Sequence, residues 1–354
     1  MNKVIAVTII LQGLIFANIT DREIANIFML GFYGSIGSDA TIKNDICKRG
    51  LGGVILFQKS PIAKGAIKNF SNAASLRALT SDLKSCGTKP LIAVDQEGGV
   101  VQRIKLKANY PKAAKVAKLG EEKAKMIYSS MAYELAALGV NLNLAPVADL
   151  AINPHNRVIV KWGRSFGKDV NSVVKYNSIF INAMHRYGVG TSLKHFPGHG
   201  SSLGDTHLGF VDVTNLWQQR ELEPYKRLRW QTDTIMVAHI FNRRLDPNFP
   251  ASLSKRVING LLRREIGFGG VVISDDMQMG AIAKHYGLKE SIKLAINAGV
   301  DILLFANQVA PKRVLRIDYL VRITRELLQS GAVSESSIKA ANRRINILKE
   351  RLYR

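Results

Sequence analysis

The feature that most constrains the fold is an alternation of short apolar runs with longer amphipathic stretches. The apolar runs, rich in β-branched residues, cover residues 27–32, 53–57, 91–95, 141–147, 190–195, 234–239, 271–275 and 301–305. Amphipathic stretches lie between them, as at residues 63–84, 121–138, 170–187 and 284–298. Strands that alternate with helices form a parallel sheet covered by helices. Eight such units predict an α/β fold, a single (β/α)8 barrel of the TIM type.

The runs also change character along their length. The run over residues 271–275 reads Val-Val-Ile-Ser-Asp, so it is apolar first and polar at its end. This pattern is typical of a strand that is buried on both faces and opens into a site. A doubly wound open sheet is the alternative, but no G-x-G-x-x-G follows the first run. The basic stretch at residues 334–354 predicts a helix that closes the outside of the barrel.

The N-terminus resembles an export signal. A short basic start, Met1 to Lys3, precedes an apolar stretch at residues 4–17. We interpret residues 1–20 as a signal peptide and residues 21–354 as the barrel. We therefore expect a periplasmic or secreted protein with no stable membrane insertion after signal removal, and a cytoplasmic protein is the alternative. In that case the apolar stretch would be a first strand or helix of the fold.

The net charge indicates which classes of partner the protein can bind. Lysine and arginine outnumber aspartate and glutamate by 50 to 27, which gives a net charge of +23 and favours anionic partners. The basic residues are scattered, without an arginine-rich run or a zinc-knuckle spacing, so we expect no nucleic-acid partner.

Cys47 and Cys86 form no CxxC motif, and we expect two ordinary buried thiols, with one disulfide as the alternative.

Polar side chains gather where the predicted strands end. Catalytic groups of such barrels lie at the carboxyl ends of the strands and in the loops that follow. Asp95 ends the third run, Lys194 and His195 end the fifth, and Asp275 ends the seventh. The following loops, and the end of the sixth run, add Asp149, Arg164, His199, Asp205, His207 and His239. Four of the seven histidines therefore fall at one predicted rim.

Three chemistries are compatible with such a rim. A metal could use His195, His199, His207 and Asp275 as ligands, but their spacing matches no zinc motif. Acyl transfer needs an activated nucleophile, and no G-x-S-x-G elbow is present. Glycoside hydrolysis needs a carboxylate near the anomeric carbon and a proton donor at the leaving oxygen.

The residues fit the third chemistry. Asp275, at the end of a buried strand, suits a nucleophile. A histidine held by an aspartate can donate the proton, because its pKa lies near neutrality. Asp205 and His207 form such a pair two residues apart on one loop. The carboxylate would orient the ring and raise the pKa of the histidine.

Long motifs at these positions resemble those of family 3 glycoside hydrolases of the bacterial β-N-acetylglucosaminidase kind. The first is K-H-F-P-G-H-G at residues 194–200, followed by D-T-H at residues 205–207. The others are A-V-D-Q-E-G-G at residues 93–99 with Q-R at residues 102–103, N-L-A-P-V-A-D at residues 143–149, G-R-S-F-G at residues 163–167, M-V-A-H at residues 236–239, P-A-S at residues 250–252 and S-D-D-M at residues 274–277. The resemblance runs from about residue 21 to about residue 350.

The resemblance implies a retaining enzyme that removes β-linked N-acetylglucosamine from peptidoglycan fragments. It implies that Asp275 is the nucleophile, with Asp276 as the alternative, and that His207 is the acid/base with Asp205 as its partner. It assigns the sugar contacts to Asp95, Arg103, Arg164, Lys194 and His195. It further implies that no cofactor is needed. We also expect no metal, a carbohydrate of the muropeptide type as the partner, and a monomer.

Other functions remain in competition at this point. A β-glucosidase or β-xylosidase of the same superfamily would generally take its acid from elsewhere than an Asp–His pair. A glycoside phosphorylase would use phosphate in place of water. A basic cell-wall-binding protein without activity could dispense with Asp275 and His207, yet both are present.

Overall fold

We describe the protein from a computed structural model, which describes residues 19–34, 40–60, 65–206, 209–308 and 314–354. Most of the predicted signal peptide, residues 1–18, lies outside the described residues, as does His207. Among the described residues, no helix is both long and apolar enough to cross a membrane.

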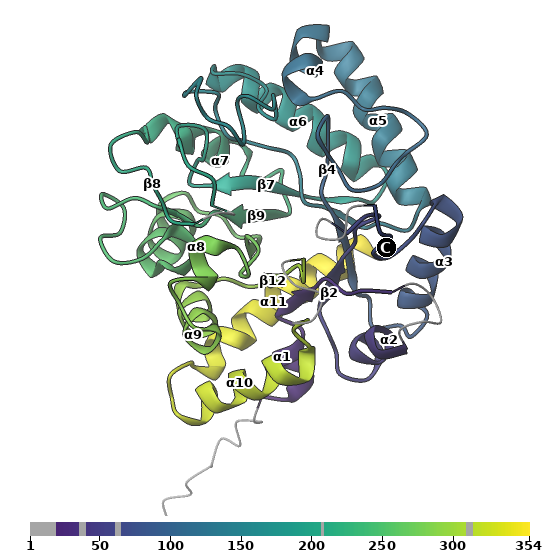
Figure 1. Ribbon diagram of the computed structural model, residues 1–354, viewed down its shortest axis with the longest axis vertical. Coiled ribbons are helices and arrows are strands. Elements are labelled where there is room, and N and C mark those ends of the chain that lie inside the picture. The colour runs from purple at the N-terminus through teal and green to yellow at the C-terminus, as the bar shows by residue number, and fades with distance from the viewer. Residues whose placement is uncertain (1–18, 35–39, 61–64, 207–208, 309–313) are drawn as a thin grey trace, which may run out of the picture.

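Eight parallel strands form the centre of the molecule and confirm the predicted barrel (Figure 1). They are β1 (Phe28–Leu30), β2 (Gly53–Ile55), β3 (Leu91–Val94), β6 (Leu142–Asn143), β7 (Gly190–Phe196), β9 (Thr234–Val237), β11 (Val271–Ser274) and β12 (Leu303–Phe305). From β1 to β11 each strand pairs with the next in chain order, and β1 also pairs with β12. A bridge between Ile273 and Ile302 joins β11 to the residue before β12. The sheet is thereby nearly closed, and every predicted strand overlaps one of these eight.

Helices surround the strands, as Figure 1 shows for α3, α5, α6, α9 and α10. The α-helices are α1 (Asp21–Ala25), α2 (Ala40–Cys47), α3 (Ala73–Lys84), α4 (Ala113–Leu119), α5 (Glu121–Ala137), α6 (Val170–Arg186), α7 (Glu223–Leu228), α8 (Gly280–Ala283), α9 (Leu288–Ala298), α10 (Ile317–Gln329) and α11 (Glu335–Leu352). A π-helix, η3, covers Arg256–Glu265, and short 3-10 helices cover Gln219–Leu222 (η1) and Ala251–Leu253 (η2). Two small ladders, β4 (Gln96–Gly98) with β5 (Val101–Gln102) and β8 (Val211–Asp212) with β10 (Ile240–Phe241), stand beside the barrel.

Two predicted helices begin later than their amphipathic pattern suggested. The helix expected over residues 63–84 begins at Ala73, where Asn72 and Ser75 form a capping box. The chain before it contacts the barrel rim instead, because Asn69 donates its side-chain amide to Phe32 O and accepts from Phe57 N, both at 2.9 Å. The helix expected over residues 284–298 begins at Leu288, after the separate short helix α8.

The C-terminal helix α11 lies across the amino-terminal end of the barrel, and not on its outside as the sequence suggested. Asn342 donates to Glu23 O before β1 at 2.8 Å, and Arg344 pairs with Asp301 before β12 at 2.9 Å. Tyr353, just past the helix, donates to Pro90 O before β3 at 2.6 Å. All three partners precede a strand, so α11 covers that opening and leaves the carboxyl end for a site.

The two cysteines form a disulfide, so the expectation of two free thiols is wrong. Cys47 at the end of α2 joins Cys86 just after α3, with Cα atoms 5.5 Å apart. Sequence spacing could not predict the pair, because the 39-residue separation becomes a short distance only when α2 and α3 pack side by side.

Opening this disulfide is expected to lower the free energy of unfolding by up to about 4 kcal/mol. A cross-link over a loop of this length restricts the unfolded chain by roughly that amount in the chain-entropy account. Thermal unfolding of the oxidised protein, the reduced protein and the Cys47→Ser/Cys86→Ser variant measures the effect. Equal melting temperatures for all three would contradict it.

Candidate active site

The residues expected to contact the sugar lie at the carboxyl ends of the strands. Asp95 follows β3, Lys194 and His195 lie within the last residues of β7, and Asp275 follows β11. Arg103 follows β5, and Arg164 lies in the long connection between β6 and α6. Parallel strands end at one rim of a barrel, so residues from distant parts of the sequence come together there.

Lys194 and Arg164 both bind the carboxylate of Glu97 at this rim. The Lys194 ammonium lies 2.7 Å from Glu97 and 2.8 Å from Asp95, and the Arg164 guanidinium donates twice to Glu97, each at 2.8 Å. Burial alone would raise the pKa of Glu97, but the two cations outweigh it and hold that pKa far below its usual range. Burial would lower the pKa of Lys194, and the two carboxylates reverse the shift, so the lysine stays charged. The cluster presents fixed donors and acceptors of the kind that hold sugar hydroxyls.

Arg103 stands at the edge of the cluster. Its Nε lies 3.9 Å from the Asp95 carboxylate, too far for a hydrogen bond, and this buried atom has no hydrogen-bond partner among the described residues. Buried donors in folded proteins are normally paired. The guanidinium therefore has donor capacity to spare for a ligand beside Asp95.

Asp149 organises the loop that carries two of the histidines. Its carboxylate lies 2.7 Å from Nδ1 of His195 and accepts the backbone N–H of His199 at 2.8 Å. Burial would raise the pKa of Asp149, and the adjacent His195 reverses this and lowers it. His199 is itself buried, and Nδ1 lies 2.6 Å from the Ser202 hydroxyl. Burial lowers the pKa of His199 to about 4, so this ring is neutral at pH 7 and supports the loop.

The loop with Asp205 reaches across the rim to the segment that follows Asp275. Ala281 N at the start of α8 donates to Thr206 O at 3.2 Å. The Asp275 carboxylate is close enough to His199 to raise the pKa of that ring, against the larger effect of burial. The two predicted catalytic segments are thus neighbours in space. Asp205 itself belongs to the described residues, whereas its predicted partner His207 does not.

The two adjacent aspartates after β11 differ in environment. Asp276 accepts the backbone N–H groups of Gln278 and Ala306, both at 3.1 Å. Burial raises the pKa of Asp276 to about 6, and these hydrogen bonds oppose the shift. Asp275 accepts Asp276 N at 2.8 Å and is near His199, which follows β7 at the carboxyl end of the barrel. Asp276 therefore serves to hold the turn, and Asp275 is the better candidate for the reacting carboxylate.

Sequence reasoning gave too little weight to three buried acids. Glu97 lies within the motif at residues 93–99 and binds both Arg164 and Lys194. Asp149 was noted only as a polar residue in a loop, and Glu221 was not singled out. The position of Glu97 two residues after Asp95 was a usable signal, but nothing in the sequence places Glu221 under the histidine loop.

Glu221 is buried beneath that loop, and its ionisation is expected to make stability pH-dependent. It accepts Ser201 N at 3.3 Å and Gln218 N at 3.1 Å, and a Cβ on Gly198 would lie 2.6 Å from its own Cβ. Burial raises the pKa of Glu221 from 4.5 to about 7. Between these values the folded state holds a proton that the unfolded state has released, so stability falls as pH rises.

The expected loss from Glu221 between pH 5 and pH 8 is on the order of 3 kcal/mol. Urea unfolding of the protein and its Glu221→Gln variant across this range measures the slope. The variant should lack this contribution, because glutamine does not ionise. Equal slopes for the two proteins would show that Glu221 is not the group responsible.

Two further features bear on the choice of site. Within the part of the chain that the structure describes, no group of three His, Cys, Asp or Glu side chains could hold a metal ion.

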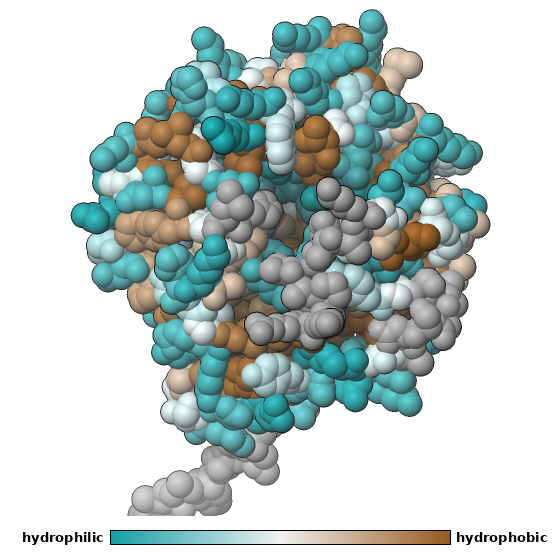
Figure 2. All heavy atoms as spheres, viewed as in Figure 1, coloured by the Kyte–Doolittle hydropathy of each residue, from teal (hydrophilic) through white to brown (hydrophobic). Residues whose placement is uncertain are grey.

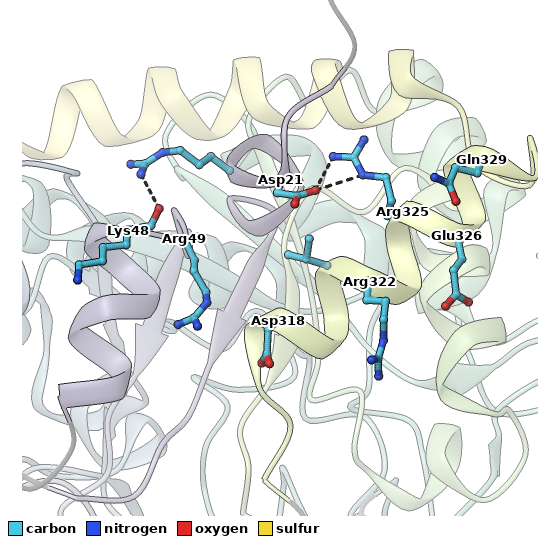
Figure 3. Close-up of a pocket in the computed structure, with 10 residues that line it drawn as sticks. Asp21, Lys48, Arg49, Asp318, Arg322, Arg325, Glu326 and Gln329 are labelled. Atoms are coloured by element: carbon cyan, nitrogen blue, oxygen red, sulfur yellow. Dashed lines mark hydrogen bonds and ion pairs between the residues drawn. The ribbon is translucent and has the colours of Figure 1, made fainter.

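A cavity of about 530 Å³ lies between α1, the end of α2 and α10 (Figure 3). Its polar groups partly satisfy one another, since Arg325 pairs with Asp21 and Arg22 donates to the backbone carbonyl of Lys48 at 2.7 Å. Of the elements that line this cavity, α1 precedes β1, and α2 and α10 lie beside the strands and away from the rim. The cavity therefore does not belong to the site.

Fold and rim together define a barrel in which a strand-end carboxylate lies near a cluster of charged side chains, an arrangement that suits a glycosidase. The model of the glycosyl hydrolase family 3 N-terminal domain matches residues 19–348. The chain belongs to this family and is a glycosidase.

Relatives of similar sequence agree with the assignment. The chain is 35% identical to a beta-hexosaminidase of Tolumonas auensis over 270 residues, 73% of this chain and 77% of the relative. It is 32% identical to that of Idiomarina loihiensis over 305 residues, 80% of this chain and 91% of the relative.

Solved structures show the same fold. A family 3 beta-N-acetylglucosaminidase from Paenibacillus sp. superposes with a TM-score of 0.84 at 30% identity, over 95% of this chain and 63% of that one. A beta-N-acetylhexosaminidase from Beutenbergia cavernae superposes with a TM-score of 0.81 at 26% identity, over 93% of this chain and 98% of that one. The chain thus spans under two thirds of the Paenibacillus protein and nearly all of the Beutenbergia one.

Proposed function

We propose that the protein is a retaining exo-β-N-acetylglucosaminidase that forms a covalent glycosyl intermediate on Asp275. The observation that carries the proposal is that Asp275 and the predicted sugar contacts lie at one rim of the barrel. The segments that follow Asp275 and Asp205 are joined by the hydrogen bond from Ala281 N to Thr206 O, and Lys194 pairs with Asp95 and Glu97 at the ends of β7 and β3. In the retaining reaction a carboxylate attacks the anomeric carbon and an acid protonates the leaving oxygen.

His207 is the acid/base in this proposal, with Asp205 as its partner. The pair is two residues apart, and Thr206 O between them is fixed by Ala281 N. The same group then removes a proton from the water that hydrolyses the intermediate. Asp95, Arg103, Arg164, Lys194 and His195 hold the N-acetylglucosamine residue. The names of the relatives, beta-hexosaminidase and beta-N-acetylglucosaminidase, support the sugar specificity.

The stereochemistry of the first product tests the proposal. Proton NMR of fresh digests of an aryl β-N-acetylglucosaminide should show the β-anomer of N-acetylglucosamine before mutarotation. First release of the α-anomer would rule out retention. Faster turnover of the aryl β-glucoside would instead identify a β-glucosidase, and a sugar phosphate formed in phosphate buffer would identify a phosphorylase.

We further propose that the natural substrate is a peptidoglycan fragment that carries carboxylates. A cleft of about 640 Å³ extends from Arg103 along the loops after β2 and β5. Lys59, Lys105 and Lys107 line it together with Arg103, and none of the described lining residues is acidic. Such a cleft favours the anionic peptide of a muropeptide over a neutral chitin fragment.

The charge preference is tested by comparing an N-acetylglucosaminyl muropeptide with neutral N,N′-diacetylchitobiose. In the Lys59→Gln/Lys105→Gln/Lys107→Gln variant, kcat/KM for the muropeptide should fall about tenfold and that for the neutral disaccharide should not change. Glutamine at Lys48, Lys118 and Lys123, which are exposed and outside the cleft, is the matched control. An equal loss on both substrates would contradict the role of the cleft.

Export and a monomeric state complete the proposal. A disulfide is typical of proteins that fold in oxidising compartments, so the Cys47–Cys86 bond supports a periplasmic or secreted location. Sequencing the N-terminus of the mature protein tests the cleavage of the signal peptide, and a start at Met1 would contradict it.

The face seen in Figure 2 is mostly hydrophilic, with its apolar side chains in separate patches, which agrees with a monomer.

A further inference from the structure

Lys68 is a buried lysine at the carboxyl end of the barrel that has no part in the reaction as proposed. Its side chain is only 1% exposed, and Nζ donates to Ala306 O at 2.8 Å and to Asn307 O at 3.1 Å. The rings of Tyr33 and Phe57 lie 4.8 and 4.5 Å from Nζ. These four partners follow β12, β1 and β2, so the ammonium group joins three neighbouring strand ends.

Burying this ammonium group is costly. Burial lowers the pKa of Lys68 to about 7, and the carboxylate of Asp276 opposes the shift. A buried lysine whose described partners are backbone oxygens and aromatic rings is rare, because removing the charge from water is costly. Its hydrogen bonds go to backbone oxygens just beyond β12, so its structural effect is on that segment.

The segment after β12 is joined to the turn after β11 by reciprocal hydrogen bonds. Asn307 N donates to the side chain of Gln278 at 2.7 Å, and Gln278 Nε2 donates back to Asn307 Oδ1 at 3.2 Å. Ala306 N and Gln278 N both donate to Asp276 Oδ1 at 3.1 Å. Asp276 N in turn donates to the Asp275 carboxylate at 2.8 Å. A continuous set of hydrogen bonds thus leads from Lys68 to Asp275.

We propose that Lys68 is a positioning residue, which fixes the segment after β12 and, through Asn307 and Gln278, the orientation of the Asp275 carboxylate. Lys68 cannot act on the sugar directly, because its side chain is buried under Tyr33 and Phe57. The inference rests on the proposed function, in which Asp275 attacks the anomeric carbon. A nucleophile displaced by about 1 Å can slow a reaction about a hundredfold.

Kinetics of the Lys68→Met variant test the proposal. Methionine has a similar length but neither the charge nor the donors. We expect kcat on an aryl β-N-acetylglucosaminide to fall about 10- to 100-fold, with KM within about twofold. The sugar contacts on β3 and β7 are unchanged, so binding should persist.

Lys349→Met is the matched control. Lys349 is also buried, its pKa is lowered to about 7 by burial, and it donates to Asn26 at 2.6 Å, but it lies on α11 at the other end of the barrel. This variant should lose stability without loss of kcat. Equal losses of kcat in the two variants, or an unchanged kcat in Lys68→Met, would overturn the role of Lys68.

Gln278→Met provides a second route if Lys68→Met does not fold. Gln278 is only partly buried and lies between Asn307 and Asp276 in the set of hydrogen bonds. We expect a similar fall of kcat, and a double variant should be no slower than the slower single variant, because the two residues act in series. Additive losses, or an unchanged kcat in Gln278→Met, would contradict the connection. Activity that survives in Asp275→Asn would instead refute the proposed function, whatever the Lys68 result.

Discussion

Replacing Asp275 by asparagine is expected to lower kcat on an aryl β-N-acetylglucosaminide by about four orders of magnitude. The amide cannot attack the anomeric carbon, and Asp276 cannot replace it, because its carboxyl group accepts Gln278 N and Ala306 N. The fold should be retained, since the residue stands at a strand end and asparagine can still accept Asp276 N. Steady-state kinetics together with circular dichroism measure both effects.

Asp276→Asn is the control for that experiment. It tests the alternative assignment that the sequence left open. We expect a smaller loss of kcat, since asparagine retains an acceptor for the two backbone donors. If the Asp276 variant is inactive and the Asp275 variant is nearly as active as the natural protein, the nucleophile has been assigned to the wrong aspartate.

Replacing Arg164 by methionine is expected to lower both stability and activity. The guanidinium makes two hydrogen bonds to Glu97, whose side chain is 5% exposed. Removing one partner of a buried ion pair typically costs about 3–5 kcal/mol. The loss of a charge-assisted donor to the sugar should also lower kcat/KM about a hundredfold.

Arg263→Met separates the two effects. Asp301 is a buried carboxylate held by two cations, Arg263 at 2.5 Å and Arg344 at 2.9 Å, at the amino-terminal end of the barrel. It reproduces the arrangement of Glu97 with Arg164 and Lys194 away from the rim. We expect a comparable loss of stability in urea unfolding but unchanged kcat/KM. Full activity in the Arg164 variant would remove that residue from the sugar site.

Much of the architecture could be predicted because parallel strands buried on both faces read as continuous apolar runs. Residues 271–275 are an example, with β11 ending at Ser274 and Asp275 following it at the rim. The same logic placed Asp95, Lys194 and His195, since each ends a run. The periodicity rule failed at residues 63–84, where the side chain of Asn69 satisfies backbone groups of Phe32 and Phe57 and the helix begins later.

What the sequence could not predict depends on contacts between distant residues. Glu97 and Arg164 are 67 residues apart, and Lys68 and Ala306 are 238 apart. The Cys47–Cys86 bond and the position of α11 across the amino-terminal opening are of the same kind. No local pattern encodes these pairs, because they exist only once the barrel has closed.

Trapping the covalent intermediate tests the central claim most directly. A fluorinated N-acetylglucosaminyl fluoride, which forms a glycosyl enzyme faster than water releases it, would be incubated with the protein before digestion and mass spectrometry. We predict one added sugar on the peptide that contains Asp275, and none in the Asp275→Asn variant. A sugar attached to another residue, or an active enzyme that accumulates no adduct, would contradict the account.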